Sequence, residues 1–304
     1  NSLALKLSGI DKDFKITDGQ AGYLERDPQT GELTGIHIPD PRDEAIRDLI
    51  RARTDAVTDR RDNRHRLKAF LLRHGYKYAG KSSWTEPHLR YLRELVLADP
   101  AHKVVLEEYL LAITQATDRI ERLETHIATL ATTWRMKPVV DALQGLRGVQ
   151  LLTAVALAAE LGDLSRFRHP RQLMAFLGLV PSEYSSGEGR RQGSITKAGN
   201  SHARWFLVEA AQHYRLPPKV SKELAPRQEK LPARLKEISW KAQVRLHRKY
   251  WTMTHRGKRV QTIQVAVARE LVGNRCPVHY APDLDGALAI MQAQEVAVVI
   301  TDIE

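Results

Sequence analysis

A regular apolar repeat between residues 109 and 130 constrains the fold of this chain more than any other feature. Apolar side chains recur there in alternating steps of four and three residues, a spacing that places them along one line of a helix, as in a coiled-coil seam. A seam of this kind must be buried against another helix. We therefore predict an antiparallel helical hairpin or a dimer contact. The seam consists of Tyr109, Ile113, Ala116, Ile120, Leu123, Ile127 and Leu130.

A second, charged helix is predicted upstream of the seam. Residues 42–74 have helical periodicity, with Asp40 as a possible N-cap and Gly75 as a stop. The middle of this stretch, TDRRDNRHR from Thr58, is nearly all charged. Such a run usually forms a solvated helix face, and a face turned toward nucleic acid is the alternative. The helix that carries the seam is predicted to begin near residues 85–87.

Composition excludes several classes of protein. The 304 residues are 42% hydrophobic, with no run of about 18 apolar residues, which predicts a globular chain and not a membrane protein. The helical patterns along most of its length predict a mostly α fold. A net charge of +11 predicts a polyanionic partner, and nucleic acid is favoured over a membrane because the basic residues are interleaved with His, Trp and Tyr. The lone Cys276 excludes a disulfide framework and fits a reducing cytoplasm.

The segment from Pro181 to Arg204, PSEYSSGEGRRQGSITKAGNSHAR, is polar and rich in glycine. Its glycines let the backbone turn freely, so Ser185 and Ser186 are predicted to lie on a loop. A loop serine beside cations can attack a phosphorus centre or hydrogen-bond a phosphate, and a solvated basic turn is the alternative. The cations around these hydroxyls are Arg190, Arg191, Lys197 and Arg204.

Residues 138–181 are predicted to form a helix, a tight turn at Arg147-Gly148 and a strongly apolar helix from Leu151 to Leu161. This order matches the helix-hairpin-helix pattern, in which backbone amides of the turn contact a phosphate. The turn reads Arg-Gly-Val where two glycines are more usual. A plain helical hairpin is an equal alternative.

Further helices are predicted over residues 197–214, about 232–255 and 260–271, the last ending at Gly273. His202 and Arg204 fall in the first turns of the first of these and are candidates for nucleic-acid binding. The second has two stripes at helical spacing. We predict that the aromatic stripe packs in the core rather than stacking bases, and that the basic stripe contacts nucleic acid. The stripes are Trp240, Val244, His247 and Trp251, and Lys241, Arg245 and Arg248.

Both ends of the chain read differently from its middle. Residues 1–40 predict short β structure, and Asp11 follows the first strand, where ribonuclease-H-like nucleases place a metal ligand. An aspartate in an ordinary turn is the alternative. The last thirty residues predict a strand, a helix and a buried strand at 296–300, resembling the first half of a receiver domain with Asp302 at the phosphorylated position. We interpret this end as an out-of-place tail.

The middle of the chain resembles a known family. The runs LRGV and AVALAAELGDLSRFRHPRQLMAFLGLVPSEYSSGEGRRQGSITKAGNSHAR are similar to the C-terminal domain of bacterial insertion-sequence transposases that also have a RuvC-like DEDD nuclease domain, the bridge-RNA-guided recombinases. Three further runs, GELTGIHIPDPRDEAIRDL, HRLKAFLLRHG and SWTEPHLRYL, resemble the linker and coiled coil of the same family. The resemblance covers about residues 31–273.

This resemblance implies specific roles. In the pattern GLVPSEYSSG it places the nucleophile that links covalently to DNA on Ser186, with Mg²⁺ held by four acidic residues of the nuclease domain. From their charge and proximity, we expect Arg190, Arg191 and Lys197 to stabilise charge on the phosphoryl oxygens. The implied partners are DNA, a structured guide RNA and further copies of the chain, as a dimer or a dimer of dimers.

The family's acidic residues have only partial counterparts here. Asp11 could be the first, Asp18 could match one member of a later pair, and Ala21 stands where the other is expected. The string TDRRD, which that pair usually takes, occurs at residues 58–62 inside the charged helix, where we interpret it as coincidence. The expected organisation is a nuclease remnant (1–40), a coiled coil (41–135), a serine transposase domain (136–274) and a tail (275–304). A catalytically inactive, nucleic-acid-binding remnant is the alternative function.

Overall fold

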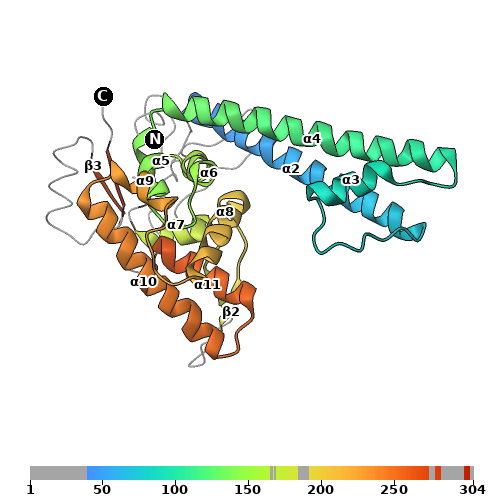
Figure 1. Ribbon diagram of the computed structural model, residues 1–304. Coiled ribbons are helices and arrows are strands. Elements are labelled where there is room, and N and C mark those ends of the chain that lie inside the picture. The colour runs from blue at the N-terminus through green and yellow to red at the C-terminus, as the bar shows by residue number, and fades with distance from the viewer. Residues whose placement is uncertain are drawn as a thin grey trace, which may run out of the picture. The chain divides into compact units, whose positions relative to one another are not determined.

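The computed structural model describes residues 40–164, 167, 169–183, 192–273, 278–281 and 298–301. Over these residues the chain is mostly α-helical, as predicted (Figure 1). Its contacts divide it into residues 1–44 and residues 45–304. The strands predicted within residues 1–40, and Asp11 with them, lie outside the described residues. None of the helices described combines the length and apolarity that crossing a membrane requires.

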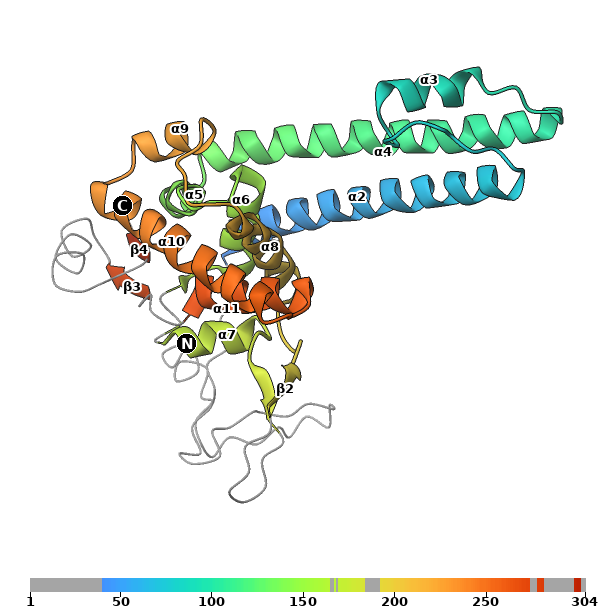
Figure 2. The same ribbon diagram turned by 60° about the horizontal axis from the view of Figure 1, so that its bottom comes forward.

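Two long helices, α2 (Pro41–Arg73) and α4 (Pro100–Thr132), form an antiparallel hairpin and lie side by side in both views (Figures 1 and 2). Arg53 of α2 pairs with Glu124 at 2.6 Å, and further along α2 Asp59 lies 3.6 Å from Arg119. Partner numbers on α4 fall as those on α2 rise, which defines the antiparallel direction. Of the two predicted arrangements, the structure therefore forms the hairpin, with most of the seam buried.

The predicted ends of α2 are confirmed, whereas the predicted start of the seam helix is wrong. Asp40 Oδ1 accepts a hydrogen bond from Arg42 N at 2.8 Å, and Gly75 adopts a positive φ of 77°. The stretch after residue 85 forms a separate short helix, α3 (Glu86–Glu94), and α4 begins only at Pro100. Proline disfavours a helical conformation for the residue before it, and Asp99 instead caps α4 by accepting from Ala101 N at 2.7 Å.

The remaining helices surround α6 (Leu151–Leu161), whose residues 154–161 are all buried. Its sequence is apolar on nearly every side, so it can only be stable in the interior of a domain. The main core also includes Ile46, Ile50 and Ile127 of the helical hairpin. The helices around α6 are α5 (Lys137–Gln144), α7 (Pro170–Phe176), α8 (Ser201–Gln212), the 3₁₀ helix η2 (His213–Arg215), α9 (Leu224–Glu229), α10 (Ala233–His255) and α11 (Val260–Gly273).

The helix predicted from Lys197 starts four residues later, at Ser201. Lys197 has a φ of 58° and Gly199 a φ of 96°, both outside the helical region. Asn200 caps α8 by accepting from Ala203 N at 2.9 Å. The backbone must therefore complete a turn before the helix can begin.

Short strands occur at two places. β1 (Pro181–Glu183) pairs antiparallel with β2 (Gln192–Ile195), a pairing that the sequence did not predict. β3 (Val278–Ala281) pairs in parallel with β4 (Val298–Thr301), starting with Val278 opposite Val298. Both strands predicted in the C-terminal segment are thus present. The helix predicted between them, and Asp302, lie outside the described residues.

The aromatic stripe of α10 is not in the core, and that prediction is wrong. The buried side of α10 is instead made by Ser239, Ala242, Gln243, Leu246 and Tyr250. A helix that packs on one side of a domain can bury only one stripe. The buried stripe of α10 contacts the end of α5, since Ser239 Oγ donates to the carbonyl of Gly145 at 2.7 Å. The aromatic stripe consequently remains at the surface.

Candidate nucleic-acid interface

The predicted nucleophile Ser186, with Arg190 and Arg191, belongs to residues 184–191, which lie outside the described part of the chain. The structure does describe the two strands that flank this segment. Ser182 Oγ donates to the carbonyl of Ser194 at 3.0 Å. Lys197 N donates to the carbonyl of Gly178 at 3.1 Å, which closes the base of the β1-β2 hairpin.

Two glycines let the base of this hairpin cross the end of α7 in direct backbone contact. A Cβ at Gly178 would lie 2.0 Å from the carbonyl oxygen of Ala198, and one at Gly199 would lie 2.2 Å from that of Phe176. Both glycines have positive φ, which other residues rarely adopt. The base of the hairpin is therefore fixed to α7 and α8 by the backbone itself.

A fully buried carboxylate, Glu160 of α6, holds the start of α8. Asn200 Nδ2 donates to its Oε2 at 2.7 Å, and Arg51 of α2 donates to both oxygens at 2.9 and 3.0 Å. His202 Nδ1 lies 3.1 Å from Oε1, and His202 Nε2 lies 3.1 Å from Thr54 Oγ1 of α2. One side chain thus joins the helical hairpin, α6 and α8.

The ionisation of Glu160 follows from these contacts. Burial by itself raises the pKa of this carboxyl group, but contacts from His202, Arg51 and Asn200 outweigh burial and lower the pKa to about 2. Glu160 is therefore an anion at neutral pH. Glu160 was not among the predicted site residues, although a glutamate inside the apolar run LLTAVALAAEL indicates a buried charge.

A groove of about 620 Å³ runs between the β1-β2 hairpin and α11. Lys197, Lys249 and Arg269 line it together with Glu270. Glu270 pairs with Lys249 and lies 3.1 Å from Nε of Arg245. The groove is therefore basic, and Lys197 is an exposed cation at its edge.

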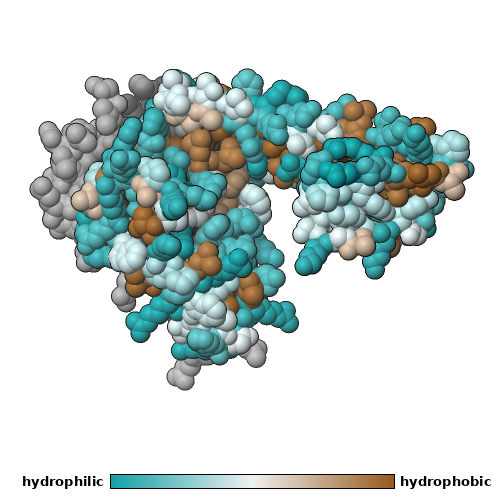
Figure 3. Space-filling model, viewed as in Figure 1, coloured by the Kyte–Doolittle hydropathy of each residue, from teal (hydrophilic) through white to brown (hydrophobic). Residues whose placement is uncertain are grey.

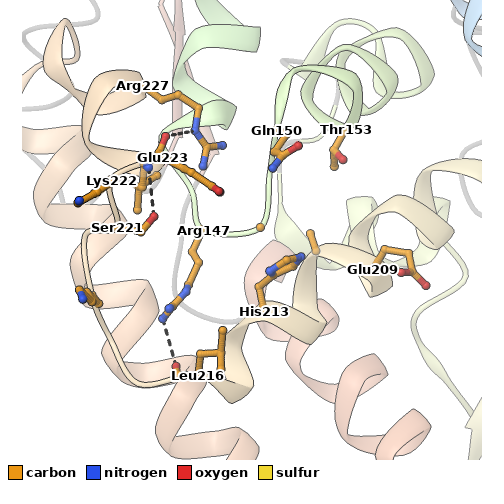
Figure 4. Close-up of a pocket in the computed structure, with 14 residues that line it drawn as sticks. Arg147, Gln150, Thr153, Glu209, His213, Leu216, Ser221, Lys222, Glu223 and Arg227 are labelled. Carbon is orange, nitrogen blue, oxygen red and sulfur yellow. Dashed lines mark hydrogen bonds between the residues drawn. The ribbon is translucent and has the colours of Figure 1, made fainter. Parts of the chain in front are cut away.

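A second cavity of about 540 Å³ lies at the turn between α5 and α6 (Figure 4). Arg147 of this turn donates through Nη1 to the carbonyls of Leu216 and Pro217 at 3.1 and 2.7 Å. Arg227 donates to the carbonyls of Glu223, at 3.0 Å, and Val149. Burial lowers the pKa of both arginines, yet a guanidinium remains charged in proteins.

Further cations surround the same space. Lys219 and Lys222 also line the cavity, together with His213 and the carboxylates Glu209 and Glu223 (Figure 4). The predicted tight turn is present, because Gly148 has a φ of 80°. Arg147 and Arg227 were not among the predicted site residues, because their positions depend on a segment that lies about 70 residues away in the sequence.

The other predicted site residues fall into two groups. His202 and Arg204 contact other residues of the same chain: His202 lies beside Glu160, and Arg204 Nη1 donates to the carbonyl of Leu177 at 2.7 Å. Lys241 pairs with Glu237 at 2.8 Å, whereas Arg248 is exposed. The structure therefore brings His202 and Arg204 together at the start of α8 and leaves the basic stripe of α10 on a different surface.

The fold and these cavities define a mostly helical protein in which a domain with two basic cavities is joined to a coiled-coil hairpin. Residues 140–223 match the family described as Transposase IS116/IS110/IS902. This match identifies residues 140–223 as a domain of that family of insertion-sequence transposases, which confirms the resemblance in the sequence.

Individual relatives agree with this assignment. The chain is 46% identical over 250 residues to the y4qE protein of Sinorhizobium fredii, whose name describes it as a transposase; the match covers 82% of this chain and 61% of that protein. It is 26% identical over 225 residues to the transposase for insertion sequence element IS1533 of Leptospira borgpetersenii, covering 73% of this chain and 65% of the relative. It is 30% identical over 170 residues to the transposase for insertion sequence element IS1111A of Coxiella burnetii, covering 55% of this chain and 44% of the relative. The chain thus spans less than two thirds of the length of each of these relatives.

Proposed function

We propose that this protein is a DNA transposase that acts on insertion-sequence DNA, with Ser186 as its nucleophile. The observation that carries the proposal is the family match over residues 140–223, which includes the serine-bearing segment and both strands that flank it. The fixed backbone at the base of the β1-β2 hairpin supports the proposal, because a nucleophile must be positioned accurately relative to the phosphorus atom.

The proposed reaction is a phosphoryl transfer. Ser186 Oγ loses its proton and forms a bond to the DNA phosphorus, and the bond from that phosphorus to a deoxyribose oxygen breaks. The departing deoxyribose oxygen takes up a proton and becomes a hydroxyl group. In joining, the hydroxyl group of another strand loses its proton, bonds to the phosphorus and displaces Ser186 Oγ, which regains a proton. Arg190, Arg191 and Lys197 would stabilise the charge that develops on the phosphoryl oxygens.

The metal ion implied by the family does not enter this scheme. Within the described ranges no group of three or more His, Cys, Asp or Glu side chains could hold a metal ion. We therefore assign no step to Mg²⁺. Its implied ligands, beginning with Asp11, belong to residues outside the described part of the chain.

We further propose that the cavity at the α5-α6 turn holds a DNA phosphate. Carbonyl groups fix Arg147 and Arg227 in place, so little side-chain entropy would be lost when they meet an anion. Phosphate contacts of this kind position a protein on DNA without reading its sequence. From the family resemblance we also propose that the protein binds a structured guide RNA and assembles as an oligomer.

Substitution of Ser186 tests the nucleophile. Ser186→Ala is expected to abolish DNA joining and the covalent protein–DNA adduct, because no hydroxyl is left at that position, while duplex binding stays unchanged. Joining on a supercoiled donor plasmid and adduct formation on a denaturing gel measure the two effects. The neighbouring Ser185→Ala variant is the matched control and should retain joining. Joining by Ser186→Ala would show that the assigned role is wrong.

A second candidate function is a binding protein without catalytic activity. It is favoured by Ala21, which stands at a position where the family has an acidic residue. The two functions differ in one measurement. A binding-only protein retards donor DNA in a gel but yields neither cleaved strands nor adduct when Mg²⁺ is added.

A further inference from the structure

We propose that the exposed aromatic face of α10 binds single-stranded nucleic acid by stacking unpaired bases on Trp240 and Trp251. This aromatic face consists of Trp240, Val244, His247, Trp251 and His255. The proposal goes beyond strand joining, because it concerns another surface and requires no contribution from Ser186.

The aromatic face is exposed where a core stripe was predicted. Trp240, Val244 and Trp251 are 45%, 46% and 42% exposed. Figure 3 shows separate apolar patches within a mostly hydrophilic surface on the side of the molecule that it displays. Large apolar side chains in such a row are uncommon on a protein surface that has no partner.

The orientation of Trp251 is fixed by its neighbours. Its Nε1 donates to the carbonyl of Arg215 at 2.9 Å, and its ring centroid lies 6.3 Å from that of His247 and 5.9 Å from that of His255. His247 Nδ1 in turn lies 3.1 Å from the carbonyl oxygen of Tyr214. A ring held at its edge, with almost half of its surface open, loses little freedom when a base stacks on it.

Cations flank the aromatic face on two sides. η2 and the segment after it contact α10, since Trp251 Nε1 donates to the carbonyl of Arg215 and Lys219 N donates to Gln243 Oε1 at 3.1 Å; they contribute the exposed Arg215 and Lys219. Arg248 of α10 is also exposed. In the described part of the chain, none of these three cations pairs with a carboxylate.

This combination favours nucleic acid over a protein partner. Proteins that bind single strands combine aromatic stacking platforms with cations that follow the phosphate backbone. The backbone of Lys219 contacts α10 through Gln243, and Lys219 also lines the basic cavity at the α5-α6 turn. Unpaired bases expose the flat surfaces that tryptophan rings stack on, whereas bases inside a duplex do not.

A binding experiment on the full chain tests the proposal. Fluorescence anisotropy would measure the affinity for labelled oligothymidine, oligouridine and a duplex. In the double variant W240A/W251A, single-strand affinity should fall by about 5- to 100-fold for each stacked base, and duplex affinity should not change. The two single-stranded probes show whether the surface takes DNA, RNA or both.

Control variants show whether a loss of affinity comes from base stacking at this face. Trp205→Ala removes a tryptophan of similar exposure on α8 and should leave single-strand affinity unchanged, and W240F/W251F should retain most of it. Ser186→Ala should bind single strands normally, so failure of the proposed nucleophile would not affect this result. The proposal would be overturned if W240A/W251A lost no affinity, or lost equal affinity for single strands and duplex. A changed sedimentation coefficient of W240A/W251A would also overturn it, because it would indicate a protein interface.

Discussion

At the residue scale, Glu160 shows how one buried charge connects distant parts of the chain. Its partners come from α2, over 100 residues earlier, and from the start of α8, 40 residues later. A carboxylate taken out of water is stable only when its oxygens are fully paired. Because each oxygen of Glu160 has partners, this charge fixes where α8 begins relative to α2 and α6.

Glu160→Gln is therefore expected to be strongly destabilising. A pKa of about 2, against about 4.3 in an unfolded chain, corresponds to roughly 3 kcal/mol of stability at neutral pH. Because the pKa is lowered in the folded state, this contribution is complete above the unfolded-state pKa and is lost as pH falls toward 2. Urea unfolding at several pH values measures it.

The pH dependence gives this prediction its own control. The difference in unfolding free energy between wild type and Glu160→Gln should shrink between about pH 5 and pH 2. Glu121 is exposed, so Glu121→Gln should change the free energy of unfolding little at any pH. A difference between wild type and Glu160→Gln that stays constant across this range would contradict the assigned charge state.

At the scale of elements, the β1-β2 hairpin depends on its glycines more than on its few strand hydrogen bonds. Its strands have only three and four residues, too few for an isolated hairpin to be stable. The close crossing of Gly178 and Gly199 with neighbouring backbone compensates by fixing the base of the hairpin.

Gly199→Ala should consequently disturb the hairpin base. The added Cβ meets a backbone carbonyl that cannot move alone, in addition to the strain of a positive φ, which costs about 1–2 kcal/mol. Gly75→Ala is the matched control, because Gly75 also has a positive φ but no atom within 4 Å of the added Cβ. We expect Gly199→Ala to lose more stability in urea unfolding and also to lose DNA joining. Equal costs for the two variants would show that the crossing is not tight.

At the scale of the whole molecule, net charge controls association with nucleic acid. A charge of +11 attracts any polyanion, and counterion release makes that attraction depend on salt. Among the described residues, some cations pair with carboxylates, as Lys103 does with Glu107, whereas others, such as Lys197 at the groove, are exposed.

The salt dependence of duplex binding distinguishes these two kinds of cation. If Lys197 contacts a phosphate, Lys197→Gln should weaken duplex binding and reduce the slope of log affinity against log salt by about 1. Lys103→Gln, which removes a cation paired with Glu107 on α4, should leave the slope unchanged. Titrations at several salt concentrations measure both slopes, and identical slopes for Lys197→Gln and wild type would exclude this contact.

The sequence by itself determined the features that depend on neighbours within about four residues. The seam of α4, the cap at Asp40, the helix Leu151–Leu161 and the span of α10 follow from local periodicity and capping. The family, too, was recognisable from contiguous runs of residues. Each of these signals is contained in a short stretch of chain.

Only the tertiary structure decided which surfaces face each other. Glu160 acquired its partners, α10 acquired its buried side, and Arg147 and Arg227 were brought to one cavity through contacts between segments far apart in sequence. Two stripes of α10 were both apolar enough to be buried, and nothing in the nearby sequence indicates which of them packs in the core. The choice depends on which stripe fits against α11, because close packing in a protein interior is a property of both partners.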